Sequence, residues 1–125
     1  MILLLSLLIL KHFIVDFPMQ IPYMYLNKGT YGHNGGVLHA TLHALATFGI
    51  LFYATGDLRL SNDLACVDGF VHYHIDWAKM NIGKKTGWGP LTSEYFWWLL
   101  GLDQYLHYMT YVFILWDVNK LGGIS

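Results

Sequence analysis

Residues 37–55, VLHATLHALATFGILFYAT, decide the fold, because they form a mostly apolar run with two histidines near its start. No Asp, Glu, Lys or Arg interrupts this run, and Gly56 follows it directly. Glycine just after a periodic segment is a helix stop signal, and about 20 apolar residues suffice to cross a bilayer. The segment therefore predicts a helix from Val37 to Thr55 that is suited to a membrane, with His39 and His43 on one face.

Three more helices are expected on either side of this segment. Pro18 and Pro22 make regular helix costly after the first apolar stretch, and the turn-rich sequence NIGKKTGWGP (81–90) separates the last two segments. The expected helices run from about Ile2 to Phe17, from Leu64 to Met80 and from Thr92 to Val118. We predict an all-α, integral membrane four-helix bundle with up-down topology, in which residues 1–125 form a single transmembrane domain.

The composition favours the bilayer as the solvent of this chain. It is 55% hydrophobic and only 12% charged, too few charges to cover the surface of a small soluble fold. The net charge of -1 offers no basic footprint, which argues against nucleic-acid binding. Cys66 is the single cysteine, so a metal would have to be held by nitrogen and oxygen ligands.

Each expected helix carries one pair of potential metal ligands four residues apart, and residues i and i+4 share one helical face. If neighbouring helices are antiparallel, the four pairs also lie at the same level along the bundle axis. The opposite halves of the helices are then almost entirely apolar. We therefore expect one buried cluster made of His12, Asp16, His39, His43, His72, Asp76, Asp103 and His107.

Eight nitrogen and oxygen ligands favour a dinuclear centre of zinc, iron or manganese. Some of the eight can instead orient ligands, as an aspartate does for a metal-bound histidine. Candidates for this outer role or for substrate contact are Gln20, Asp68, Lys79 and Gln104. His33 and His74 are expected to lie outside the site. The competing interpretation is a buried network of His–Asp hydrogen bonds that pins the helices together or relays protons.

Lysines and aromatic residues gather on the side of the bundle where the first and third connections lie. By the positive-inside rule, this side is expected to face the cytoplasm in a multi-pass protein of the cell (inner) membrane, with the metal site nearer that face. The aromatic residues are Tyr23, Tyr25, Trp88, Tyr95, Trp97 and Trp98, and the lysines are Lys28, Lys79, Lys84 and Lys85.

Several segments together resemble a domain-of-unknown-function family of small bacterial and phage membrane proteins. The segments that carry the resemblance are HFIVDFPMQ (12–20), NKG (27–29), LHATLHAL (38–45), HYHIDWAK (72–79) and LDQYLHY (102–108). They match the family motifs H-x3-D-x3-Q, N-K-G, H-x3-H, H-x3-D-x2-K and D-Q-x2-H over nearly the whole chain. The resemblance implies the same paired His/Asp motifs on four helices and no established activity.

We expect a metal-dependent hydrolase at the cytoplasmic membrane surface, acting on a phosphoester or lipid-like substrate. The metal would lower the pKa of a water molecule, and Asp16, Asp76 or Asp103 would take its proton. Two alternatives stay open: a di-iron membrane oxidoreductase, and a non-enzymatic metal-binding or ion-conducting subunit of a larger membrane complex. The expected partners are the lipid bilayer and either other membrane proteins or a second copy of the chain.

Overall fold

The computed structural model describes residues 1–121, and all regular structure in this part of the chain is helical. The helices are α1 (Ile2–Asp16), α2 (Pro22–Tyr25), α3 (Asn34–Thr55), α4 (Leu58–Thr86) and α5 (Glu94–Lys120). The prediction of an all-α chain is confirmed. The four long helices correspond to the four expected ones, and the short α2 is an addition.

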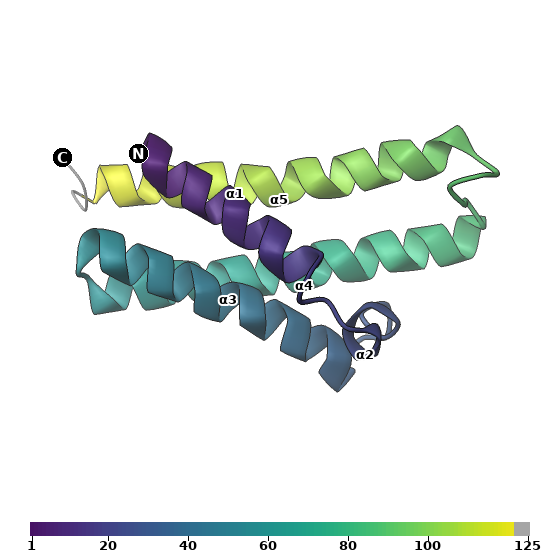
Figure 1. The fold of residues 1–125 in the computed structure, drawn as a ribbon, viewed down its shortest axis with the longest axis horizontal. Coiled ribbons are helices and arrows are strands. Elements are labelled where there is room, and N and C mark those ends of the chain that lie inside the picture. Colours follow the sequence, from purple (N-terminus) through teal and green to yellow (C-terminus); the bar gives the residue numbers. More distant parts are fainter. Residues whose placement is uncertain (122–125) are drawn as a thin grey trace.

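The four long helices close into a ring around a common interior. α1 packs against α3 and α5, α3 packs against α4, and α4 packs against α5. Figure 1 shows the start of α1 and the end of α5 at the same end of the molecule, and α4 and α5 extending together beyond the last turn of α1. The interior is therefore enclosed by four helices only along the length that α1 covers.

Helix α4 is longer than expected at both ends. The Asp57 side chain accepts a hydrogen bond from the backbone N–H of Leu60 at 2.9 Å, so the helix begins at Leu58 and includes the polar residues before Leu64. At the other end α4 continues through Lys84 and Lys85 to Thr86, and Gly87 ends it with a φ of 71°. The predicted limits of Leu64 and Met80 were wrong. The polar residues beyond them suggested the ends of the helix, whereas the N-cap Asp57 and the C-terminal Gly87 lie farther out.

The other boundaries differ from the predictions by a few residues. Helix α5 begins at Glu94, because the Ser93 side chain accepts from the backbone N–H of Tyr95, and Pro90 lies in the preceding loop. Helix α3 begins at Asn34, where the His33 side chain accepts from the backbone N–H of Gly35. The expected long first connection also contains α2, with Pro22 as its first residue.

Two glycines at the start of α3 let the α2 segment lie directly against it. A Cβ atom on Gly35 would clash with the backbone oxygen of Tyr23, and one on Gly36 would lie 3.1 Å from the Cα atom of Lys28. No side chain fits at Gly35 without moving this backbone. The close approach fixes the position of Lys28 beside α3 and, as shown below, directs its side chain into the bundle.

The interior of the bundle has an apolar layer and a polar layer. The apolar layer lies toward the chain ends, as expected from the apolar halves of the helices. Its buried side chains are Leu4, Leu8, Leu51, Leu64, Tyr111, Ile114, Leu115 and Val118. The polar layer lies beyond Tyr111, where the four ligand pairs meet.

Among the described helices, α3 alone combines the length and the apolar composition that are needed to cross a membrane. The predicted multi-pass membrane protein thus has one candidate span by this measure, because α4 carries too many charged residues and α1 has only 15 residues.

Candidate metal centre

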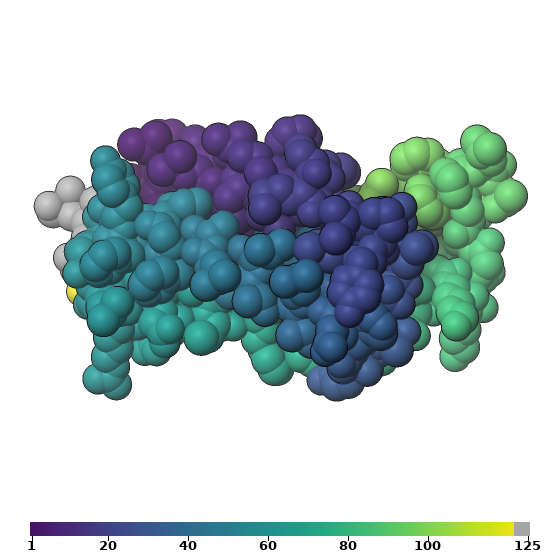
Figure 2. Space-filling view, turned by 60° about the horizontal axis from the view of Figure 1, so that its bottom comes forward, coloured from purple at the N-terminus to yellow at the C-terminus, as the bar shows by residue number. Residues whose placement is uncertain are grey.

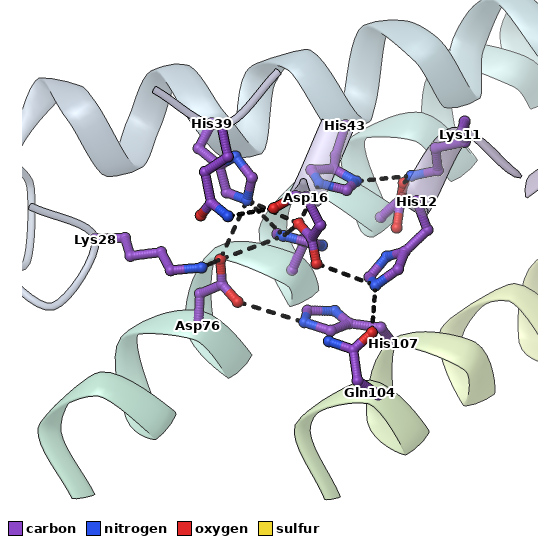
Figure 3. A network of polar contacts seen from close by, with 12 residues as sticks. Lys11, His12, Asp16, Lys28, His39, His43, Asp76, Gln104 and His107 are labelled. Carbon is purple, nitrogen blue, oxygen red and sulfur yellow. Dashed lines mark hydrogen bonds and ion pairs between the residues drawn. The ribbon is translucent and has the colours of Figure 1, made fainter. Parts of the chain in front are cut away.

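The structure brings all four predicted pairs together in the interior of the bundle. Each of the eight residues is at most 6% exposed, and imidazole nitrogens and carboxylate oxygens face one another across the four helices (Figure 3). Three overlapping groups of potential metal ligands result. They are His12, Asp16, His43 and His72; His39, His72 and Asp76; and Asp76, Asp103 and His107.

Asp16, in the last turn of α1, is surrounded by imidazoles from α3, α4 and its own helix. Its Oδ1 atom lies 2.9 Å from His43 Nε2, 3.0 Å from His39 Nε2 and 3.4 Å from His72 Nε2. Its Oδ2 atom lies 3.0 Å from His12 Nε2. The Asp16 carboxylate thus contacts the Nε2 atoms of four imidazole rings.

His39 and His72 bring their Nε2 atoms to 3.1 Å from each other. Both atoms also lie 3.3 Å from Asp76 Oδ2. Two imidazole nitrogens bound to one ion at about 2.0–2.1 Å are separated by about 2.9–3.4 Å at octahedral to tetrahedral angles. The observed spacing is compatible with two ligands of the same ion, with Asp16 and Asp76 on either side, and equally with a hydrogen bond between the two rings.

Asp103 and His107 adjoin this group but have unused hydrogen-bonding atoms. His107 Nε2 lies 3.4 Å from both Asp76 Oδ1 and Asp103 Oδ1. Among the described residues, neither His107 Nε2 nor Asp103 Oδ1 has a hydrogen-bond partner, although both atoms are buried. Buried polar atoms are nearly always satisfied, so this pair is suited to a further group such as a water molecule or an ion.

The hydrogen bonds around His12 determine which of its nitrogens carries a proton. Gln104 Nε2 donates to Asp103 Oδ2 at 3.1 Å, so the amide oxygen of Gln104 must face His12. This oxygen and Asp16 Oδ2 both lie 3.0 Å from His12 Nε2, which must therefore donate. Tyr111 OH lies 2.9 Å from His12 Nδ1 and can donate to it. In this arrangement His12 is a donor to Asp16 and has no lone pair for a metal at Nε2.

The same reasoning applies to His43 on the opposite side of Asp16. The Lys11 ammonium lies 3.1 Å from His43 Nδ1 and donates to it, because an ammonium cannot accept. The Nε2 atom of the neutral His43 ring therefore carries the proton that is donated to Asp16. Lys11 also forms a 2.6 Å ion pair with Asp68, which accepts a further hydrogen bond from Thr47 at 2.6 Å. Asp68 thus holds Lys11, Lys11 orients His43, and His43 orients Asp16.

Three lysines reach into this polar layer, and the sequence predicted only one of them. Lys79 pairs with Asp103 at 3.2 Å, in accordance with its proposed outer role. Lys28 was counted only among the lysines on the side expected to face the cytoplasm, but it is 7% exposed and pairs with Asp76 at 3.0 Å. Lys11 received no role, although a charged residue in the apolar sequence of α1 is itself a signal of function in a membrane segment.

The remaining candidates fall into two groups. Gln20 donates to the backbone oxygen of Asp16, and its own Oε1 atom is buried and without a partner among residues 1–121. His33 caps α3, and His74 lies on an exposed face, where its Nδ1 donates to the backbone oxygen of Phe70 at 2.7 Å. Gln20 thus adjoins the cluster, whereas His33 and His74 lie outside it.

The chain belongs to the family described as "Protein of unknown function (DUF3307)", which matches residues 4–122. The resemblance to a family of unknown function is thereby confirmed, whereas the bacterial or phage origin and the membrane location stay predictions. No curated protein and no solved structure matches the chain.

Proposed function

We propose that this protein is a membrane-embedded, metal-dependent hydrolase whose metal centre lies toward the cytoplasmic face. The observation that carries the proposal is the approach of His39 Nε2 and His72 Nε2 to 3.1 Å between the carboxylates of Asp16 and Asp76. These four residues would hold the ion. An ion held there would supply Lewis acidity and an activated water molecule.

The neighbouring residues are suited to handle the proton that hydrolysis releases. Asp103 Oδ1 is buried, has no hydrogen-bond partner among the described residues and lies beside His107 Nε2. Asp103 also lines a groove that opens between α4 and α5. Asp103 is therefore the carboxylate that we assign as general base, and Asp16 and Asp76 are assigned to the metal.

The buried charges favour one ion over the two that the sequence suggests. Asp16, Asp68, Asp76 and Asp103 face only three lysines, which leaves one negative charge when the histidines are neutral. One divalent cation changes this balance to one positive charge, and two would change it to three. A large net charge is costly away from water, so a single zinc, iron or manganese ion fits better than a di-iron centre.

The distribution of side chains supports a location in the membrane. Within residues 1–121, fourteen polar or charged residues are buried against twelve hydrophobic ones, while large apolar side chains such as Phe13, Leu102 and Trp116 are more than half exposed. This interior is more polar than a soluble core, and the outer surface suits lipid. Extraction of isolated membranes with alkaline carbonate tests the location: an integral protein stays in the pellet, and release into the supernatant contradicts the proposal.

Elemental analysis of protein purified without added metal or chelator tests the centre. We expect about one transition-metal ion per chain, loss of the ion in His39→Ala and His72→Ala, and unchanged content in His33→Ala. Equal metal content in all three variants would overturn the assignment. Metal-dependent hydrolysis of a phosphoester such as p-nitrophenyl phosphate should fall in Asp103→Asn while its metal content stays the same.

A further inference from the structure

Two hollows meet beside the candidate metal centre, where α4 and α5 extend beyond α1. We name the first the basic pocket; it has a volume of about 440 Å³, and its lining includes Lys79, Lys84, Trp88 and Phe96. One wall is the segment after α2, which Asn81 holds against α4 by donating to the backbone oxygen of Gly29 at 2.8 Å. In Figure 2 the end formed by α4 and α5 (green) projects beyond the segment that carries α2 (dark blue).

The second hollow, the apolar groove, lies between α4 and α5. It has a volume of about 350 Å³ and is lined almost entirely by apolar side chains such as Ile75, Ala78 and Leu106. The polar exceptions include Lys79 and Asp103, and these are also the residues that connect the groove to the metal centre. Both volumes lie within the range of small-molecule sites.

Lys79 and Leu99 line both hollows, so the two adjoin at these side chains, and a ligand that extends past them would occupy both. Lys79 and Lys84 line the basic pocket, and no Asp or Glu of the described chain lines it, which favours an anionic group. The apolar groove offers space for a hydrocarbon chain. At about 1.5 Å per residue, α4 and α5 exceed the ~30 Å thickness of the hydrocarbon layer, and their joined ends would lie among lipid head groups.

We propose that the basic pocket and the apolar groove together bind an anionic phospholipid with a phosphomonoester head group. The head group pairs with Lys84 and Lys79, and one acyl chain lies in the apolar groove. The phosphate is thereby placed beside Asp103, next to the candidate metal. As an assignment of substrate class, this inference rests on the proposed function; as an assignment of a binding site, it is tested separately.

Calorimetric titration of the full chain in dodecyl maltoside micelles tests the site with three probes: dihexanoyl phosphatidic acid, dihexanoyl phosphatidylcholine and inorganic phosphate. We expect phosphatidic acid to bind at least about tenfold more tightly than either other probe, because only it offers both the charge and the chains. Equal affinity for phosphatidylcholine would contradict the proposed role of the basic pocket in binding an anionic head group. Equal affinity for inorganic phosphate would reduce the site to a phosphate-ion site and overturn the role of the groove.

Matched variants separate the two hollows. Lys84→Gln should weaken phosphatidic acid binding at least about fivefold, whereas Lys85→Gln, also exposed on α4 but outside the basic pocket, should leave it unchanged. Ala78→Phe fills the apolar groove and should weaken phosphatidic acid but not inorganic phosphate. Val112→Phe, on the exposed face of α5, is its control. Equal effects of Lys84→Gln and Lys85→Gln would overturn the site.

Metal content of the same preparations distinguishes this inference from the proposed function. Selective phosphatidic acid binding by a protein that contains no metal would support the lipid site and contradict the proposed metal-dependent hydrolase function. A metal-loaded protein that does not discriminate among the three probes would overturn the site alone.

Discussion

Lys28 Nζ lies 3.0 Å from Asp76 Oδ2, the carboxylate oxygen that also faces His39 and His72. The ammonium of a loop residue thus occupies the side of Asp76 that a metal ion would share. Both cations are attracted by the same oxygen, so the charge of Lys28 stabilises the metal-free bundle and opposes binding of the ion.

Lys28→Met should therefore separate stability from metal affinity. Without metal, removal of one partner from a buried ion pair should lower the free energy of unfolding by about 3 kcal/mol. With metal, the lost positive charge should raise affinity at least about tenfold. Thermal unfolding in EDTA and competition with a chelator measure the two effects. Lys85→Met, at an exposed position, is the control, and identical melting temperatures for the two variants in EDTA would contradict the role of Lys28.

His43→Gln should retain the metal ion, whereas His39→Gln should lose it. His43 donates to Asp16 and accepts from Lys11, two roles that an amide can take over, but an amide is a poor substitute for a metal-bound imidazole. Elemental analysis of the two purified variants is the measurement. Metal loss in both would show that His43 is itself a ligand.

Gly35→Ala should destabilise the protein, because the added Cβ atom would clash with the backbone oxygen of Tyr23. We expect the free energy of unfolding to fall by at least about 1–3 kcal/mol. Gly49→Ala, in the same helix, is the matched control: its Cβ atom meets nothing within 4 Å, and alanine should stabilise the helix by up to about 1 kcal/mol. Thermal unfolding followed by circular dichroism compares them. A melting temperature for Gly35→Ala at or above that of the unmodified protein would contradict the close approach.

Tyr111→Phe should lower the free energy of unfolding by about 1–2 kcal/mol. The substitution removes the hydroxyl that lies 2.9 Å from His12 Nδ1 and leaves this buried nitrogen without its partner. Tyr108→Phe is the control, since Tyr108 is 36% exposed and only its ring lies near His12. Denaturant unfolding provides the comparison. If the two substitutions prove equally costly, the hydroxyl of Tyr111 has no special role.

The i,i+4 spacing of His and Asp was enough to predict the cluster, because a regular helix fixes which side chains share a face. His12 and Asp16 on α1 meet His39 on α3 and His72 on α4, as the depth argument required. The roles within the cluster could not be predicted, since they depend on partners from distant segments. Lys11, for example, orients His43 across 32 positions of sequence, and Lys28 reaches Asp76 across 48.

The helix ends were harder to predict for a different reason. Ser61, Asn62 and Asp63 have low helix propensity, but Asp57 caps the helix before them and Ser61 is fully buried in the bundle. Tertiary packing thus overrides local preference at this end of α4.

Tyr111 separates the polar layer from an apolar layer in which Leu8, Leu51 and Ile114 have no exposed surface. The polar layer is thus closed by apolar side chains on the side where α1 begins and α5 ends. A substrate of the proposed hydrolase would therefore have to enter and leave on the opposite side, near Lys79, and the apolar layer would oppose the passage of an ion through the bundle.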